Sequence, residues 1–188
     1  MAIDYSIKAI PTIYNGVQYR SRLEARWAAM LTLLGWEHQY EPYDLGGWSP
    51  DFLTGPRGCE KILVEVKPIE DFDLGTATRM AGACRENEIG KMLMLVGVQP
   101  FVIKHRVRLG WVGWSLDRPD GWEHDPVMWG PIPGSDEQGA DIVLTSNMEG
   151  TPFRMFAPEY SVADLSAMSD HTMGLWAKAT NAVQWHRK

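Results

Sequence analysis

Two charges interrupt an otherwise apolar stretch at residues 62–68, which read ILVEVKP. Side chains on a strand alternate between the two faces of a sheet, so Glu65 and Lys67 should point the same way while Val64 and Val66 point the other way. A structural ion pair would explain the two charges, although such pairs add little net stability because desolvation offsets the attraction. For Glu65 and Lys67 taken alone, we favour this structural explanation.

A second carboxylate, Asp51, favours a different interpretation. It starts a short strand in the motif SPDF, and a hairpin through the loop TGPRGCE can bring it beside Glu65. Two clustered carboxylates raise each other's pKa unless a positive group lies between them. Mg²⁺ suits this arrangement, because it is usually bound by one or two carboxylates, waters and substrate phosphates. The carbonyl of Val66 could add a ligand, and Lys67 could orient or deprotonate a water or neutralise a developing charge.

Glu24 is a third acid, on the clearest predicted helix, SRLEARWAAMLTLLGW, where it borders the apolar face. Its motif, SRLE, also matches a capping box, in which Glu24 would reach back to the backbone N–H of Ser21. Taken alone, the motif favours the cap. Together with the acids of the two strands, it favours a site role, with Glu24 binding metal directly or through water. The flanking arginines would then lie near incoming phosphates: Arg20, Arg22 and Arg26.

The apolar patterns predict the elements that position these residues. A hairpin turn at Asn15-Gly16 precedes the helix, which Ser21 caps and Gly35 ends. Strands follow at residues 37–45, 49–53 and 61–68, then a helix from residue 74 to about 87 and a buried strand at 91–98. The first hundred residues are therefore predicted to run helix, three strands, helix, strand.

The second half of the chain is predicted to extend this core. Strands are expected at residues 110–116 and 140–146, separated by a Gly/Pro/Trp-rich connection at 117–139, and the C-terminal helix is expected to break near Gly174. Tryptophans between Trp111 and Trp129 could stack on splayed bases or bind a partner, but closing a small second core is favoured. We expect a single domain, 1–188, with a core of about 14–98, an extension at 99–160 and a C-terminal helical segment at 161–188.

Composition excludes several classes of protein. The chain has 188 residues, 45% of them hydrophobic, and a net charge of −6. Its two cysteines make neither a disulfide framework nor a zinc motif, and no apolar run is long enough for a membrane span, so we expect a cytoplasmic protein. The acidic charge argues against a nonspecific nucleic-acid coat, because each phosphate contact needs a local cation. It is compatible with a nucleic-acid enzyme whose basic residues are clustered.

The order of these motifs resembles the PD-(D/E)XK nuclease superfamily. Pro50-Asp51 followed by Glu65-Val66-Lys67 matches its signature. The wider string, YRSRLEARWAAMLTLLGWEHQYEP followed by SPDF and VEVKP, is similar to small nucleases of bacteriophages and other mobile genomes. More distantly, it is similar to transposon-end nucleases and phage junction resolvases. The resemblance covers roughly residues 14–98, and the full order of motifs is far more specific than the bare D…ExK triplet.

This resemblance implies a restriction-endonuclease-like αβββαβ core with a mixed central sheet, to which the second half would add a Trp-rich β extension and C-terminal helices. It also implies phosphodiester cleavage dependent on Mg²⁺ or Mn²⁺. Asp51 and Glu65 would bind the metal, Lys67 would act at the nucleophilic water, and Glu24 would complete the site. A phage-encoded protein of this kind would work in the host cytoplasm.

Three functions are therefore considered from the sequence. The leading one is a metal-dependent DNA endonuclease, acting alone or as a homodimer. The second is a nuclease subunit that needs a protein partner to supply DNA affinity, which the acidic net charge favours. The third is a non-catalytic binding or virion component that keeps the fold. The intact set of acids counts against the third, because a repulsive cluster has no purpose without chemistry.

Overall fold

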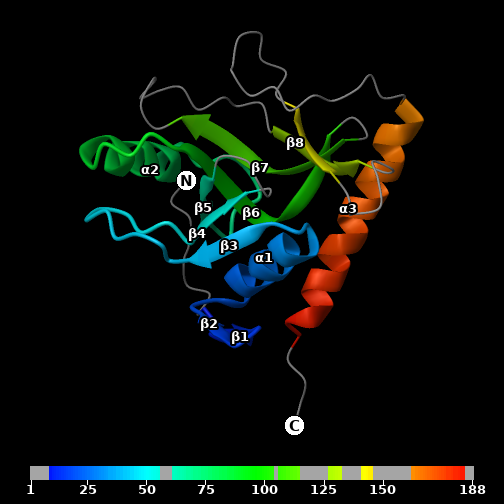
Figure 1. The fold of residues 1–188 in the computed structure, drawn as a ribbon, viewed down its shortest axis with the longest axis horizontal. Coiled ribbons are helices and arrows are strands. Elements are labelled where there is room, and N and C mark those ends of the chain that lie inside the picture. Colours follow the sequence, from blue (N-terminus) through cyan, green and yellow to red (C-terminus); the bar gives the residue numbers. More distant parts are fainter. Residues whose placement is uncertain are drawn as a thin grey trace.

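The computed structural model describes residues 9–55, 61–103, 106–114, 127–132, 141–145 and 162–184. This part of the chain is a mixed α/β structure (Figure 1). Its first half runs α1 (Arg22–Leu33), β3 (Glu37–Tyr40), β4 (Phe52–Gly55), β5 (Ile62–Val66), α2 (Leu74–Glu86) and β6 (Met92–Ile103). The predicted order of helix, three strands, helix and strand is therefore confirmed.

The large sheet is mixed, as predicted, and has the strand order β3-β4-β5-β6-β7-β8-β9. Its later strands are β7 (Arg106–Trp114), β8 (Val127–Ile132) and β9 (Asp141–Thr145). β5 and β6 pair in parallel, whereas the other neighbouring strands pair antiparallel. Parallel strands need a long crossover connection, and the segment that contains α2 provides it.

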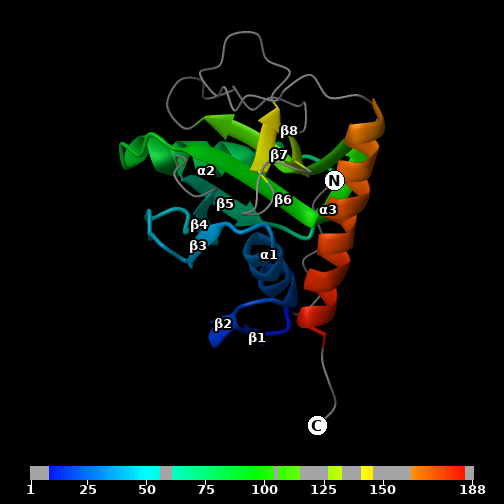
Figure 2. The same cartoon turned by 45° about the vertical axis from the view of Figure 1, so that its right-hand side comes forward.

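The helices pack on both faces of the sheet, so the core has two layers (Figure 2). Val64 and Val66 belong to the layer that includes α1 and the C-terminal part of helix α3 (Val162–Ala182). Leu63 belongs to the other layer, with the buried residues of α2. This alternation along β5 follows from the two-residue period of a strand and gives the strand a buried side chain at every position.

Helix α1 begins and ends where the sequence predicts. The Ser21 hydroxyl accepts a hydrogen bond from the Glu24 N–H at 3.1 Å, which caps the helix. Gly35 has a φ of 72°. The Gly35 N–H bonds the Thr32 carbonyl at 3.0 Å, and the next N–H, of Trp36, bonds the Leu31 carbonyl at 2.9 Å. These two bonds satisfy carbonyls at the helix end, in a conformation that glycine adopts without strain.

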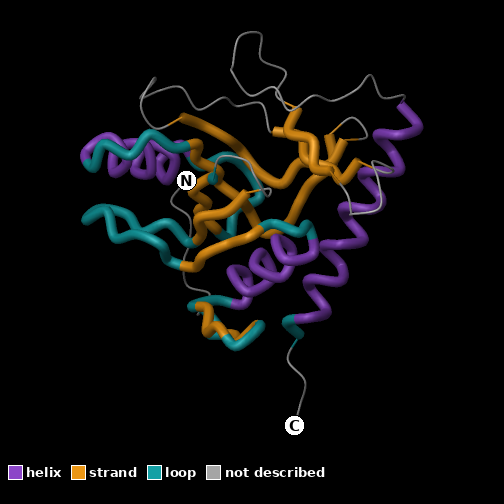
Figure 3. The backbone as a smooth tube through the Cα atoms, in the orientation of Figure 1, coloured by secondary structure: helices purple, strands orange, loops and turns teal. Residues whose placement is uncertain are grey.

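The predicted hairpin before α1 is also confirmed, as a separate two-stranded sheet of β1 (Thr12–Tyr14) and β2 (Val17–Tyr19). Its turn residues, Asn15 and Gly16, both have positive φ, at 46° and 79°. Figure 3 shows this hairpin beside the start of α1, apart from the large sheet. The hairpin therefore leads the chain directly into the helix that carries Glu24.

Two predictions for the second half are wrong. The C-terminal helix does not break at Gly174, because α3 runs through it without interruption. Trp176 and Ala179 are buried in the same core layer as α1, and this packing offsets the roughly 1 kcal/mol that a helical glycine costs. The connection predicted at residues 117–139 contains a strand, β8, which pairs with β7 and β9 on either side. Its glycine and proline concealed the strand pattern.

Residues 115–126 and 133–140 lie outside the described part, and with them much of the Trp-rich connection. Among the described residues, no helix combines the length and the apolar character needed to cross a membrane.

Candidate functional site

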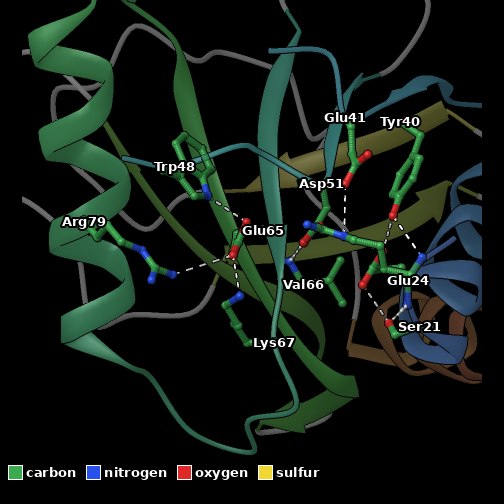
Figure 4. Close-up of polar contacts among 11 residues, drawn as sticks. Ser21, Glu24, Tyr40, Glu41, Trp48, Asp51, Glu65, Val66, Lys67 and Arg79 are labelled. Atoms are coloured by element: carbon green, nitrogen blue, oxygen red, sulfur yellow. Dashed lines mark hydrogen bonds and ion pairs between the residues drawn. The ribbon is translucent and has the colours of Figure 1, made fainter. Parts of the chain in front are cut away.

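The β4–β5 hairpin brings Asp51 and Glu65 to the same end of two neighbouring strands. Phe52 pairs with Val64 in this antiparallel ladder, so Asp51, one residue before β4, lies across from Glu65. Both carboxylates are buried, with 2% and 3% exposure respectively. Figure 4 shows them on either side of β5 near Val66. The predicted approach of the two acids is therefore confirmed.

The carboxylate of Asp51 is held by one backbone group and one cation. Its Oδ2 accepts the Val66 N–H at 2.7 Å, and its Oδ1 accepts from the guanidinium of Arg20. Burial and the nearby charge of Glu65 raise the pKa of Asp51 to about 7, although the Val66 N–H and Arg20 act in the opposite direction. Burial is the largest of these causes, so the surroundings of Asp51 disfavour its charged form.

Glu65 is bound on both oxygens. Lys67 Nζ lies 2.6 Å from Oε1, and the indole N–H of Trp48 donates to Oε2 at 2.7 Å. The guanidinium of Arg79, on α2, lies at the longer distance of 3.8 Å from Oε1 (Figure 4). The structural ion pair considered for Glu65 and Lys67 is therefore present, and it lies within the same group of residues as the acids of the predicted site.

Glu24 serves both as a cap residue and as part of this acid group. Its Oε1 accepts from the Ser21 hydroxyl at 2.8 Å, and its Oε2 accepts from the Tyr40 hydroxyl. The capping-box prediction is therefore only partly right, because the observed bond joins the two side chains. The charge of Glu24 also raises the pKa of Asp51, so the two carboxylates are close enough to interact. Burial and the bond to Glu24 raise the pKa of Tyr40 as well, so this hydroxyl keeps its proton.

The three arginines predicted to bind DNA do not behave alike. Arg20 binds Asp51 and also places its Nε 3.0 Å from Glu41 Oε1 and 3.7 Å from Glu24 Oε2. Arg22 and Arg26 are half-buried on α1, and the Nε of Arg26 has no hydrogen-bond partner among the described residues. Of the three, Arg20 is therefore the one that the described structure brings onto the acids.

The sequence did not point to Trp48, Tyr40 or Arg79, because each becomes a neighbour of an acid through the fold. Trp48 offered the best available signal. It lies three residues before Asp51, and a buried indole usually needs an acceptor for its N–H. In the β4–β5 hairpin, the carboxylate of Glu65 is that acceptor.

Asp51 and Glu65 offer oxygen atoms, the ligands that a hard divalent cation prefers. Carboxylate oxygens can each accept more than one bond, so those of Asp51 and Glu65 keep capacity beyond the donors described above. Mg²⁺ commonly uses one or two carboxylates and keeps several waters. Within the described residues, no three His, Cys, Asp or Glu side chains are gathered tightly enough to hold one ion together. Metal ligation by Asp51 and Glu65, as by the Val66 carbonyl and Glu24, stays a prediction.

Comparisons with known proteins give no family assignment. The chain matches no protein-family model, and neither the curated proteins nor the solved structures that were searched gave a match.

Proposed function

We propose that the protein is a metal-dependent endonuclease that hydrolyses phosphodiester bonds in DNA. The observation that carries this proposal is the pair of buried carboxylates, Asp51 and Glu65, at opposing positions of the β4–β5 hairpin, with Lys67 bound to Glu65. A buried, repulsive pair costs stability, which is typical of sites arranged for chemistry. The motif resemblance supports the same proposal, with a restriction-endonuclease-like core and a phage or mobile-element origin.

Each residue has a role in the proposed reaction. Asp51 and Glu65 would hold Mg²⁺, for which Mn²⁺ would substitute, and the bound ion would supply a nucleophilic water and stabilise charge on the phosphate oxygens. Lys67 is partly exposed, at 23%, so its ammonium can reach the attacking water or the phosphate while staying near Glu65. Trp48 fixes the orientation of Glu65 from the other oxygen. Glu24 would act on the α1 side, through water.

The test is plasmid nicking in the presence of Mg²⁺. Asp51→Asn and Glu65→Gln keep the shape of each side chain but remove the charge that would hold the cation. We expect each variant to lose at least about 100-fold in cleavage rate, as is common when a preorganised electrostatic group is removed. Glu86→Gln is the matched control, because Glu86 is an exposed residue at the end of α2. It should cleave at the wild-type rate.

Circular dichroism should show all three variants folded. Wild-type cleavage rates in folded Asp51→Asn and Glu65→Gln variants would disprove the assignment. Cleavage products from linear, branched and single-stranded substrates, DNA and RNA, would then define what an active enzyme cuts.

A partner-dependent nuclease subunit is the second candidate. It is favoured by the net charge of −6 and by the engagement of Arg20 with acids of its own chain, since both reduce attraction for DNA. Protein that cuts nothing alone, but cuts when the product of a neighbouring gene is added, would support this candidate. A non-catalytic binding component would instead show no change in melting temperature with Mn²⁺, because a bound ion stabilises the folded state.

A further inference from the structure

Arg20 lies at the centre of an acidic group, in which its guanidinium contacts Asp51 and approaches two glutamates. The Nε lies 3.0 Å from Glu41 and 3.7 Å from Glu24, while the Nη2 donates to Asp51 Oδ1. One positive side chain therefore faces three carboxylates. The guanidinium thus provides the positive charge that a metal ion bound at Asp51 would otherwise provide.

The buried acids do not depend on Arg20 for their orientation. Asp51 is fixed through Oδ2 by the Val66 N–H, and Glu24 is fixed by the hydroxyls of Ser21 and Tyr40. These partners come from the backbone of β5, the cap of α1 and the strand β3. Removal of the guanidinium would therefore leave both carboxylates in place.

The Arg20 side chain is far more exposed than the two buried acids that it contacts. It is 57% exposed, whereas the side chains of Asp51 and Glu24 are 2% and 10% exposed. Its ion pair with Glu41, which is 42% exposed, is worth about 1 kcal/mol or less, and desolvation of the buried carboxylates offsets much of its attraction to Asp51 and Glu24. A divalent cation that binds the same carboxylate can therefore displace the guanidinium.

The competition is for one carboxylate. Oδ2 of Asp51 accepts the Val66 N–H and Oδ1 accepts from Arg20, so a cation that binds either oxygen arrives beside the guanidinium. Two positive groups at one carboxylate repel each other. We propose that Arg20 is an exchangeable counter-cation, which occupies the acid site in the free protein and leaves it when a divalent cation binds. The metal site is that of the proposed function, and on that function the released guanidinium would be free to contact the DNA phosphate.

The test is Mn²⁺ affinity, measured by calorimetry at pH 8 without DNA. Arg20→Gln removes the competing cation, so we expect Mn²⁺ to bind about fivefold more tightly than to the wild type, the factor that corresponds to loss of an ion pair of about 1 kcal/mol. Arg85→Gln is the control for net charge, because Arg85 is exposed in the last turn of α2. It should change the affinity less than about twofold.

A second variant covers the case in which Arg20→Gln does not fold. Arg20→Lys keeps the charge, but a compact ammonium cannot span three carboxylates. We expect it to bind Mn²⁺ about twofold more tightly than the wild type. Equal or weaker Mn²⁺ binding by folded Arg20→Gln, or by Arg20→Lys if the first variant is unfolded, would overturn the proposal. So would a Mn²⁺-bound structure with the guanidinium still on Asp51.

The Mn²⁺-binding results test the exchange of Arg20 independently of whether the protein is a nuclease. If Arg20→Gln tightens Mn²⁺ binding but the wild type cuts no nucleic acid, the exchange stands and the proposed function falls. If the wild type is an active nuclease and Arg20→Gln binds Mn²⁺ more weakly, the exchange falls. In that case Arg20 would be a residue that holds Asp51 ready for the metal.

Discussion

At the scale of single residues, the buried charge of Asp51 lowers the stability of the folded protein. Burial and Glu65 disfavour its charged form more strongly than Arg20 and the Val66 N–H favour it, so its pKa is raised to about 7. A group whose pKa is raised on folding stabilises the protein below its unfolded pKa and loses that contribution as the pH rises through the folded value. Folding stability should therefore fall between about pH 4 and pH 7 on account of this group.

Asp51→Asn should thus be more stable than the wild type at pH 8 without metal, and on the proposed function it should also be inactive. The substitution removes the buried charge while keeping an acceptor for the Val66 N–H. We expect a gain in the free energy of unfolding on the order of 2 kcal/mol at pH 8, which disappears near pH 4 where Asp51 is protonated. Urea denaturation at several pH values would measure it.

Glu70→Gln is a suitable control for that experiment, because Glu70 is exposed. It should leave the free energy of unfolding within about 0.5 kcal/mol of wild type at each pH. A loss of stability in Asp51→Asn at pH 8 would contradict the expectation and would show that the pairing with Arg20 outweighs the burial of the carboxylate.

The sequence could identify the acids but not their partners. Asp51, Glu65 and Lys67 follow from a motif with fixed spacing, and the alternation of β5 decides which of them share a face. The contacts of Arg20 and Trp48 depend on the approach of α1 and of the segment before β4, which are distant in sequence. Local periodicity contains no information about such contacts. This is why Arg20 was expected on DNA and was found on the acids.

At the scale of elements, the site depends on how firmly β5 is held against β6. The parallel ladder continues past β5, with the Lys67 N–H bonded to the Val96 carbonyl at 2.9 Å. Beyond it, the backbone at Ile69 passes close to Gly97, and the indole N–H of Trp27 on α1 donates to the Gly97 carbonyl at 2.9 Å. The strand that carries Lys67 is therefore held by β6, which is in turn tied to α1.

Gly97→Ala should disrupt this contact. A Cβ at residue 97 would lie 2.3 Å from the Ile69 carbonyl oxygen, so the backbone after Lys67 would have to shift. We expect a loss on the order of 3 kcal/mol in the free energy of unfolding. On the proposed function, cleavage should also weaken in the protein that remains folded, because Lys67 is displaced. Chemical denaturation and plasmid nicking would measure the two effects.

Gly82→Ala is the matched control, since residue 82 lies inside α2 and a Cβ there would meet nothing within 4 Å. Alanine is the better helix former, so this variant should gain about 0.5–1 kcal/mol. If both variants had equal stability, the close approach at Gly97 would not constrain the strand.

Elements were predictable where a local pattern defined them. The capped helix α1, the hairpin at Asn15-Gly16 and the apolar strands β5 and β6 all have such patterns. The continuity of α3 through Gly174 and the existence of β8 do not, because each is decided by what packs or pairs beside it. Tertiary contacts override weak local preferences in both cases.

At the scale of the whole molecule, the site is supported by elements from both ends of the chain, because α1 and α3 share one core layer. Helix α3, the last element, packs its Trp176 ring 4.7 Å from the ring of Trp27 on α1, centroid to centroid. The helix that presents Glu24 is thus supported by residues about 150 positions later in the chain. A ligand bound among the acids should consequently stabilise the folded state as a whole, with a measurable rise in melting temperature.

The stabilisation by a bound divalent cation should increase with pH, whereas the contribution of Asp51 to the stability of the metal-free protein should decrease with pH. A divalent cation binds the ionised carboxylate of Asp51, whose pKa is raised to about 7 by burial and by Glu65. At pH 6 the proton competes and the apparent Mn²⁺ affinity should be about tenfold lower than at pH 8. With Mn²⁺ at about 100 times its pH 8 dissociation constant, the ion should add about 2.7 kcal/mol at pH 8.

Thermal melts with and without Mn²⁺ would show this as a rise of about 5–10 °C at pH 8 and a clearly smaller one at pH 6. Asp51→Asn supplies the control, because it removes the titrating ligand and should leave little Mn²⁺-induced shift at either pH. A shift of equal size at pH 6 and pH 8 in the wild type would mean that Mn²⁺ binds elsewhere. The acids of the β4–β5 hairpin would then be a structural cluster, and the proposed metal chemistry would have no site there.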